Sequence, residues 1–223
     1  MRHQLIVGVV LLGVIGTGLL ADEKKPVGSE RWEPTIARFE AQDEQHPPTR
    51  GGILFVGSSS IVRWDLEKWF PDLPALNRGF GGSMISDSIH FAERIVVPYR
   101  PKTIVFYAGD NDIAKGKTPA VVLADYKTFV GKVHKQLPGA KIVYVAIKPS
   151  LSRWKLVGAM REANQMIREV TLGDKRLEFV DIDTPMLGAD GRPREELFVK
   201  DGLHLSEEGY KLWTGLVMPH LKP

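Results

Sequence analysis

Short apolar runs alternate along the chain with segments in which apolar residues recur every three or four positions. Runs rich in β-branched and aromatic residues predict buried strands over 53–56, 103–107, 142–147 and 177–181. A weaker strand is expected over 75–77. The helical spacing predicts amphipathic helices over 32–39, 64–69, 85–96, 118–137, 160–170 and 206–217. Thr118 and Ser206 are expected to cap the helices that follow them.

The alternation of strands with helices is typical of an α/β fold. We therefore expect a three-layer α/β/α arrangement, with helices on both faces of a five-stranded parallel sheet. The 223 residues and the hydrophobic content of 43% suit one domain, which we place at 31–223 after a polar linker over 22–30. In a parallel sheet the loops after the strands gather at one edge, so residues far apart in sequence meet there.

The amino end has a different pattern from the domain. Arg2 and His3 precede an uncharged apolar run from Leu5 to Leu20, and acidic residues follow Ala21. This arrangement is typical of a secretory signal peptide over 1–21 and predicts a secreted or periplasmic protein. The run is long for a signal peptide and short for a spanning helix, so a short N-terminal membrane anchor is the alternative.

Composition removes several classes of site. The chain has no cysteine, which excludes disulfides, thiolate metal sites and a cysteine nucleophile. The formal charge of +3 is spread without a basic stripe, so no nucleic-acid partner is expected. The segment from Gly109 to Thr118 has too many residues between its glycines for a phosphate-binding loop. Asp110 and Asp112 fit turn positions better than cation ligands.

A serine triplet follows the first predicted strand, where the chain turns. Ser58, Ser59 and Ser60 come directly after Gly57, so one of them is a candidate nucleophile at the carboxyl edge of the sheet. His204 is the candidate base, because Asp201 precedes it by three positions on a loop before the last helix. A carboxylate in that position can hold the imidazole in one tautomer and stabilise the imidazolium.

Two further loops offer hydrogen-bond donors for a developing oxyanion. Gly82 lacks a side chain, so its backbone N–H can approach a substrate closely. Asn111 carries a neutral amide that donates without neutralising another charge. Both residues are also compatible with a structural role in a turn.

Together these residues resemble the SGNH (GDSL-type) hydrolases, a family with four blocks that hold serine, glycine, asparagine, and aspartate with histidine. The corresponding segments here are 55–60, 77–83, 109–112 and 201–204. The resemblance implies a flavodoxin-like fold and a serine esterase that cleaves carboxylic esters through an acyl-enzyme. It makes Ser59 the nucleophile, His204 the base and Asp201 its partner, with Ser59, Gly82 and Asn111 forming the oxyanion hole. It implies no metal and no cofactor.

One position departs from the family, which usually has aspartate where this chain has Ser58. That difference concerns the support of the turn that carries the nucleophile, and it permits a slow or inactive member. The Gly-x-Ser-x-Gly turn of the other large serine-hydrolase fold is absent from the sequence.

The substrate is a small-molecule or carbohydrate ester on this interpretation. The resemblance together with secretion favours short acyl groups, such as acetyl esters of carbohydrates. Lys148 and Arg153 follow a predicted strand and are candidate substrate-binding residues. A lipid or lysophospholipid acylhydrolase, an acyltransferase and a non-catalytic binding domain that kept the fold remain alternatives.

Overall fold

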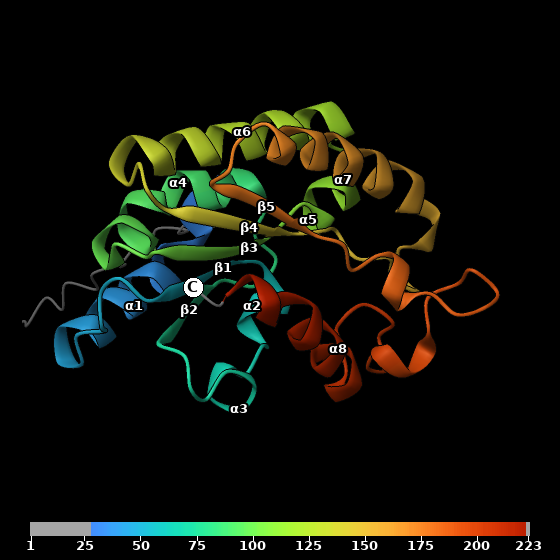
Figure 1. Ribbon diagram of the computed structural model, residues 1–223, viewed down its shortest axis with the longest axis horizontal. Coiled ribbons are helices and arrows are strands. Elements are labelled where there is room, and N and C mark those ends of the chain that lie inside the picture. Colours follow the sequence, from blue (N-terminus) through green and yellow to red (C-terminus); the bar gives the residue numbers. More distant parts are fainter. Residues whose placement is uncertain (1–27, 222–223) are drawn as a thin grey trace, which may run out of the picture.

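The computed structural model describes residues 28–221, which fold around one parallel sheet in the order β2-β1-β3-β4-β5 (Figure 1). The strands are β1 (Ile53–Gly57), β2 (Ala75–Gly79), β3 (Thr103–Tyr107), β4 (Lys141–Val145) and β5 (Leu177–Val180). Every neighbouring pair is parallel. The predicted five-stranded parallel sheet of flavodoxin-like order is confirmed.

Helices connect successive strands, as parallel pairing requires. The α-helices are α1 (Glu33–Gln45), α2 (Ser59–Val62), α3 (Leu66–Trp69), α4 (Ile85–Ile95), α5 (Asp110–Ala114), α6 (Pro119–Gln136), α7 (Val157–Leu172) and α8 (Glu207–Val217). The 3₁₀-helices are η1 (Gly28–Trp32), η2 (Val97–Tyr99), η3 (Trp154–Leu156), η4 (Thr184–Met186), η5 (Glu195–Leu197) and η6 (Met218–His220). Thr118 and Ser206 cap α6 and α8 through their side chains, as predicted.

The two faces of the sheet carry separate hydrophobic clusters, because successive strand residues point to opposite sides. Leu54 and Val56 of β1 pack with buried residues of α1, α4, α6 and α7. Ile53 and Phe55 of the same strand pack instead with residues of α2, α3 and α8. Figure 1 shows α4, α6 and α7 above the sheet and α2, α3 and α8 below it, which gives the predicted three layers.

The second strand is longer than its sequence pattern predicted and includes Arg78 and Gly79. A side chain at Gly79 would lie 2.8 Å from the backbone nitrogen of Val62, so glycine lets α2 pack directly on the end of this strand. The loop that carries Gly82 therefore begins at Phe80.

Three other boundaries differ from the predictions. The helix expected over 64–69 begins only at Leu66, as α3, because Asp65 accepts from the N–H of Lys68 and caps it. The separate helix α2, at 59–62, was not predicted. The strand expected to reach Ile147 ends at Val145, since the Asn164 side chain binds both the N–H and the C=O of Ile147. Asp110, expected in a loop, begins α5.

The order of the strands reverses direction at β1 and β3, which makes this pair the topological switch point of the sheet. The chain leaves β1 toward β2 on one side and returns to β3 on the other. Ligands of open α/β sheets bind at such a switch point, outside the carboxyl ends of the strands. Ser59 follows β1 and Asn111 follows β3, so two of the candidate residues lie at this switch point.

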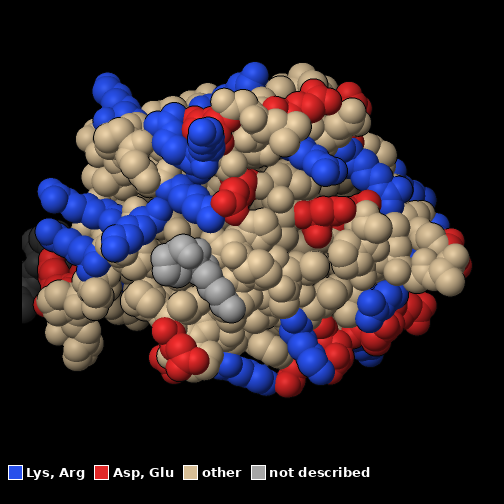
Figure 2. All heavy atoms as spheres, viewed as in Figure 1, with Lys and Arg blue, Asp and Glu red and all other residues tan. Residues whose placement is uncertain are grey.

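The predicted signal peptide over 1–21 and most of the predicted linker over 22–30 lie outside the described residues. Gly28 to Glu30, at the end of that linker, belong to η1. None of the helices in residues 28–221 is long and apolar enough to cross a membrane. Figure 2 shows charged side chains of both signs on one face, with uncharged surface between them.

Candidate active site

The turn after β1 is shaped by its contact with β3. Gly57 has φ +140°, and a side chain there would lie 1.9 Å from the carbonyl oxygen of Tyr107. The N–H of Ser58 donates to that same oxygen at 3.0 Å. Ser58 occupies the cap position of α2 without a side-chain cap bond. The backbone of β3 therefore supports this turn, and no capping bond from residue 58 is involved.

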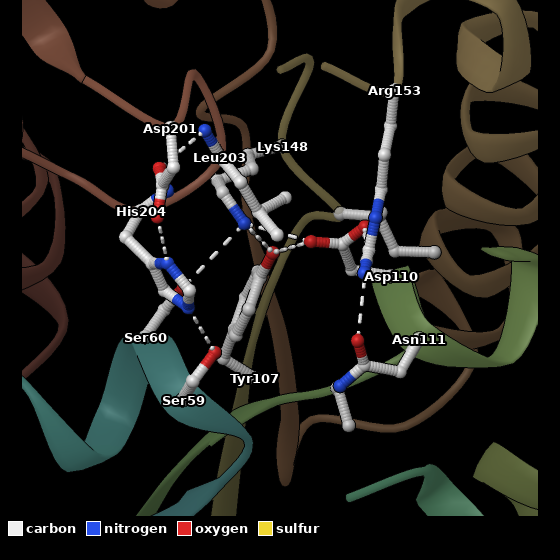
Figure 3. Close-up of polar contacts among 12 residues, drawn as sticks. Ser59, Ser60, Tyr107, Asp110, Asn111, Lys148, Arg153, Asp201, Leu203 and His204 are labelled. Atoms are coloured by element: carbon white, nitrogen blue, oxygen red, sulfur yellow. Dashed lines mark hydrogen bonds and ion pairs between the residues drawn. The ribbon is translucent and has the colours of Figure 1, made fainter. Parts of the chain in front are cut away.

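Ser59 begins α2 and points its hydroxyl at His204. The distance from Ser59 Oγ to His204 Nε2 is 3.0 Å, and His204 Nδ1 lies 2.6 Å from Asp201 Oδ2 (Figure 3). The other oxygen of Asp201 accepts from the N–H groups of Leu203 and His204, each at 2.9 Å. These hydrogen bonds, above all that from the His204 ring, hold the pKa of Asp201 well below its usual range. Asp201 is thus a carboxylate throughout the range in which an imidazole acts as a base.

The loop that carries Asp201 and His204 is tied to its surroundings by backbone bonds. The N–H of Val199 donates to the carbonyl of His204 at 2.9 Å, which closes a tight turn around Asp201. The N–H of Ser152, in the loop after β4, donates to the carbonyl of Gly202 at 3.0 Å. Ser206 then starts α8 directly after this loop. The imidazole therefore reaches Ser59 from a loop that is fixed at both ends.

The loop after β2 lies beside the nucleophile. The N–H of Phe80 donates to the carbonyl of Gly57 at 2.9 Å. A side chain at Gly81 would contact Ser59 Cβ at 3.8 Å. Gly82 has φ +78°, a conformation that favours glycine. Asn111 Nδ2 donates to the carbonyl of Ser83 at 3.0 Å and so joins the loops that follow β2 and β3.

The structure brings the five predicted residues Ser59, Gly82, Asn111, Asp201 and His204 to one edge of the sheet. The backbone N–H of Ser59, at the first position of α2, has no backbone acceptor within residues 28–221. The N–H of Ser59, the Gly82 backbone and the second N–H of the Asn111 amide are the candidate oxyanion donors. What the arrangement offers chemically is a hydroxyl bonded to an imidazole, an imidazole bonded to a carboxylate, and donors beside them.

Lys148 does not fit the predicted role of a substrate-binding residue. Its side chain is 1% exposed, and Nζ donates to Asp110 at 2.7 Å and to Tyr107 Oη at 3.0 Å. The ammonium is therefore committed to a buried ion pair below the site. Arg153, the other predicted binding residue, is 22% exposed and donates from Nη1 to Asp110 at 2.6 Å and to Asn111 Oδ1 at 3.1 Å.

Asp110 is the functional feature that sequence reasoning missed. Burial alone would raise its pKa, but the charges of Lys148 and Arg153 outweigh burial and hold the pKa below its usual value. Its place in the loop after a predicted strand was visible, yet the residue fitted a turn equally well. A lysine and an arginine after the neighbouring strand were the only sign of a partner.

Asp112 is also engaged by protein groups. Its carboxylate accepts from the N–H of Ile85 at 3.2 Å and from Lys117 Nζ at 2.8 Å. Burial raises its pKa against the effect of Lys117. No group of acidic or histidine side chains within residues 28–221 is arranged to hold a metal ion. Asp110 and Asp112 thus serve the protein's own contacts in this structure.

The amino-terminal segment also reaches the site, a contact that the sequence pattern did not indicate. Trp32, at the end of η1, packs edge-on against Phe80 with ring centroids 5.9 Å apart. Its ring would lie 3.5 Å from a side chain at Gly82. Ser29 Oγ donates to Asp87 Oδ1 at 2.6 Å and ties η1 to α4. Trp32 therefore borders the loop that carries Gly82.

Solved structures with the same fold include several esterases and lipases. A Streptococcus pneumonia protein provisionally named a platelet activating factor is 21% identical, with a TM-score of 0.77 over 86% of this chain and 94% of its own. A GDSL-like lipase from Bacteroides thetaiotaomicron is 17% identical, with a TM-score of 0.67 over 87% of this chain and 97% of its own. A variant of an acetyl-xylooligosaccharide esterase from Geobacillus Stearmophilus is 15% identical, with a TM-score of 0.62 over 78% and 96%. These identities show a shared fold.

No curated protein sequence matches the chain. The family model of the GDSL-like lipase/acylhydrolase family matches residues 57–212, a span that runs from the turn before Ser59 into α8. The match includes all five of the residues that the fold brings together at the edge of the sheet. The chain therefore belongs to the GDSL-like lipase/acylhydrolase family, the SGNH hydrolases, and is an enzyme that hydrolyses ester bonds.

Proposed function

We propose that the protein is a serine esterase in which Ser59, His204 and Asp201 form the catalytic triad. The observation that carries this assignment is the unbroken hydrogen-bonded series from Ser59 Oγ to His204 Nε2 at 3.0 Å and from His204 Nδ1 to Asp201 Oδ2 at 2.6 Å. A serine hydroxyl is a weak nucleophile until an adjacent base removes its proton. The series provides that base and a carboxylate that orients it.

The reaction proceeds in two acyl-transfer steps. His204 takes the proton of Ser59 as Oγ bonds to the ester carbonyl carbon, and the carbonyl electrons move onto oxygen. The N–H groups of Ser59 and Gly82 and the amide of Asn111 donate to that oxyanion. His204 then protonates the leaving alcohol as the carbon–oxygen bond breaks. Water repeats the sequence on the acyl-enzyme and releases the acid.

The preferred substrates are esters with short acyl groups, with acetyl esters of carbohydrates as the leading class. A long acyl chain needs an extended apolar surface next to the nucleophile. Among residues 28–221, the large hydrophobic side chains that are exposed are Val62, Val121, Leu172 and Val199. Val62 and Val199 belong to the elements that carry the triad, and two valines offer little surface for a long chain. The acetyl-xylooligosaccharide esterase among the structural neighbours supports the same class.

The protein acts outside the cytoplasm on this proposal, because its amino end has the pattern of a signal peptide. If that segment were retained as an anchor, the enzyme would work at a membrane surface. The acyltransferase alternative uses the same residues and differs only in the acceptor that meets the acyl-enzyme.

A fluorophosphonate probe tests the nucleophile directly, because it reacts with activated serines. We expect labelling of the wild-type protein at Ser59 and none of the Ser59→Ala variant. Equal labelling of both proteins would contradict the assignment.

A panel of p-nitrophenyl esters from acetate to palmitate, together with acetylated xylan and a lysophospholipid, tests the substrate class. We expect kcat/KM to be highest for acetate and acetate to be released from the polysaccharide. A maximum at long chains, with turnover of the lysophospholipid, would instead establish a lipid acylhydrolase.

A further inference from the structure

We propose that Arg153 is a positioning residue, which fixes the amide of Asn111 in the one orientation that lets it donate to the oxyanion. This role depends on the esterase function proposed above. Arg153 Nη1 donates to Asn111 Oδ1 at 3.1 Å and to Asp110 Oδ1 at 2.6 Å (Figure 3). Arg153 therefore contacts an oxyanion donor and the buried carboxylate next to it in sequence.

The orientation of the Asn111 amide decides whether it helps or hinders the reaction. Its two ends have nearly the same size but opposite hydrogen-bonding character. With Nδ2 toward the substrate it donates to the developing negative charge, and with Oδ1 there it repels that charge. In the structure each end of the amide has a hydrogen-bond partner, and each partner is compatible with only one of the two orientations.

Arg153 can only donate, and it faces Oδ1. The carbonyl of Ser83 can only accept, and it lies 3.0 Å from Nδ2. A reversed amide would place two donors together at Arg153 and two acceptors together at Ser83. The second N–H of the amide has no partner among the described residues and is left for the substrate.

Arg153 is itself held from beneath by a buried ion pair. The carboxylate of Asp110 is 5% exposed and lies between Arg153 and the Nζ of Lys148, which is 2.7 Å from Oδ2. Lys148 also donates to Tyr107 Oη at 3.0 Å. The series Lys148, Asp110, Arg153 and Asn111 thus links the loop after β4 to the start of α5. Its two cations and one carboxylate leave a positive charge near the oxyanion donors, which favours the transition state.

A direct contact of Arg153 with the substrate would have a different signature. A side chain that binds substrate and transition state equally raises KM and leaves kcat unchanged when it is removed. If a side chain acts by orienting Asn111, its removal lowers kcat in the wild-type background. The same removal has no effect in a protein that already lacks Asn111.

The experiment is a double-mutant cycle with p-nitrophenyl acetate on Arg153→Met, Asn111→Ala and the combined variant. We expect Arg153→Met to lower kcat about 10- to 100-fold with KM within about twofold, because a misdirected donor is a partial loss of an oxyanion contact. Asn111→Ala should cost about 10²- to 10³-fold, and the combined variant should match it within about threefold. Multiplied losses in the combined variant, or a raised KM with unchanged kcat, would overturn the role.

Arg153→Lys and Arg176→Met are the matched variants. Lysine keeps the positive charge but lacks the planar guanidinium that orients the donors, so we expect a partial loss of about 3- to 10-fold. This variant also tests the role if the methionine variant does not fold. Arg176 forms an ion pair with Asp174. Both residues lie just before β5 begins, at the edge of the sheet opposite the candidate site. Arg176→Met should therefore keep the wild-type kcat. Wild-type activity in both Arg153 variants would reject the role.

An NMR measurement separates this role from the proposed function. The side-chain NH₂ signals of Asn111 are assigned by their loss in Asn111→Ala. In Arg153→Met they should shift and exchange faster with water, and unchanged signals would refute the positioning role even in an inactive protein. A wild-type protein that hydrolyses no ester and is not labelled at Ser59 would instead refute the esterase assignment alone.

Discussion

The two halves of the site use a carboxylate in opposite ways. Asp201 lies on a loop, is 45% exposed and binds the ring of His204. Asp110 begins a helix, is 5% exposed and binds Lys148 and Arg153. Hydrogen bonding from His204 lowers the pKa of Asp201, whereas two cations lower that of Asp110 against the effect of burial.

The difference in burial sets what each carboxylate can contribute. The charge of an exposed carboxylate contributes little to stability because water screens it, so the main role of Asp201 is to orient the imidazole. Removing one partner of a buried ion pair strongly destabilises the folded protein, so Asp110 contributes to the stability of the fold as well as to the site. We therefore expect changes on the Asp201 side to affect rate alone, and changes on the Asp110 side to affect stability first.

The largest effect is expected from His204→Ala on the exposed side. Without the base, Ser59 keeps its proton, and kcat should fall about 10⁴- to 10⁶-fold. His204 is 17% exposed and its ring contacts polar groups, so the melting temperature should stay within about 2 °C of wild type. Steady-state hydrolysis of p-nitrophenyl acetate and a thermal melt measure both quantities. Retained activity would show that another group is the base, and that the Asp201 side does not set the rate.

Asp201→Asn should lower kcat by about 10³- to 10⁴-fold. The amide can no longer hold the imidazole in the tautomer that presents a free nitrogen to Ser59. The two backbone N–H groups keep an acceptor in the asparagine oxygen, so the loop should stay folded. Kinetics and a melt of the same sample test this, and a melting temperature lowered by more than about 5 °C would show that Asp201 supports the fold too.

Asp110→Asn is the matched change on the buried side. It leaves Lys148 and Arg153 without their anion, which should cost about 3–5 kcal/mol of the free energy of unfolding. Urea unfolding followed by tryptophan fluorescence measures that loss. Asp174→Asn is the control, because the pair of Asp174 with Arg176 is at the surface, where solvent screening leaves it little effect on stability. Equal losses in the two variants would remove the distinction between the buried and exposed pairs.

The exposed half could be predicted from the sequence and the buried half could not. A parallel sheet gathers the loops after its strands, so Ser59, Gly82, Asn111, Asp201 and His204 were expected at one edge. Lys148 follows a strand in the same way, but a lysine usually reaches solvent, and nothing in the sequence indicated that the fold buries it against Asp110. The length of β2 was missed because it depends on α2 packing against Gly79, a contact between distant residues.

The smallest expected effect is on the pH dependence of stability. The folded-state pKa of Asp110 lies below its unfolded value, so its ionised form stabilises the fold above that unfolded value, about 3.9. The contribution is lost as the pH falls from there through the folded pKa. Urea unfolding at several pH values below about 4 should therefore show a weaker loss of stability with acid in Asp110→Asn than in wild type. Asp201→Asn should weaken the acid dependence in the same direction, because hydrogen bonding also holds the pKa of Asp201 below its usual range. If Asp110→Asn lost stability with acid as steeply as wild type, the buried carboxylate would not link folding to pH, and the assignment of stability to the buried side would be wrong.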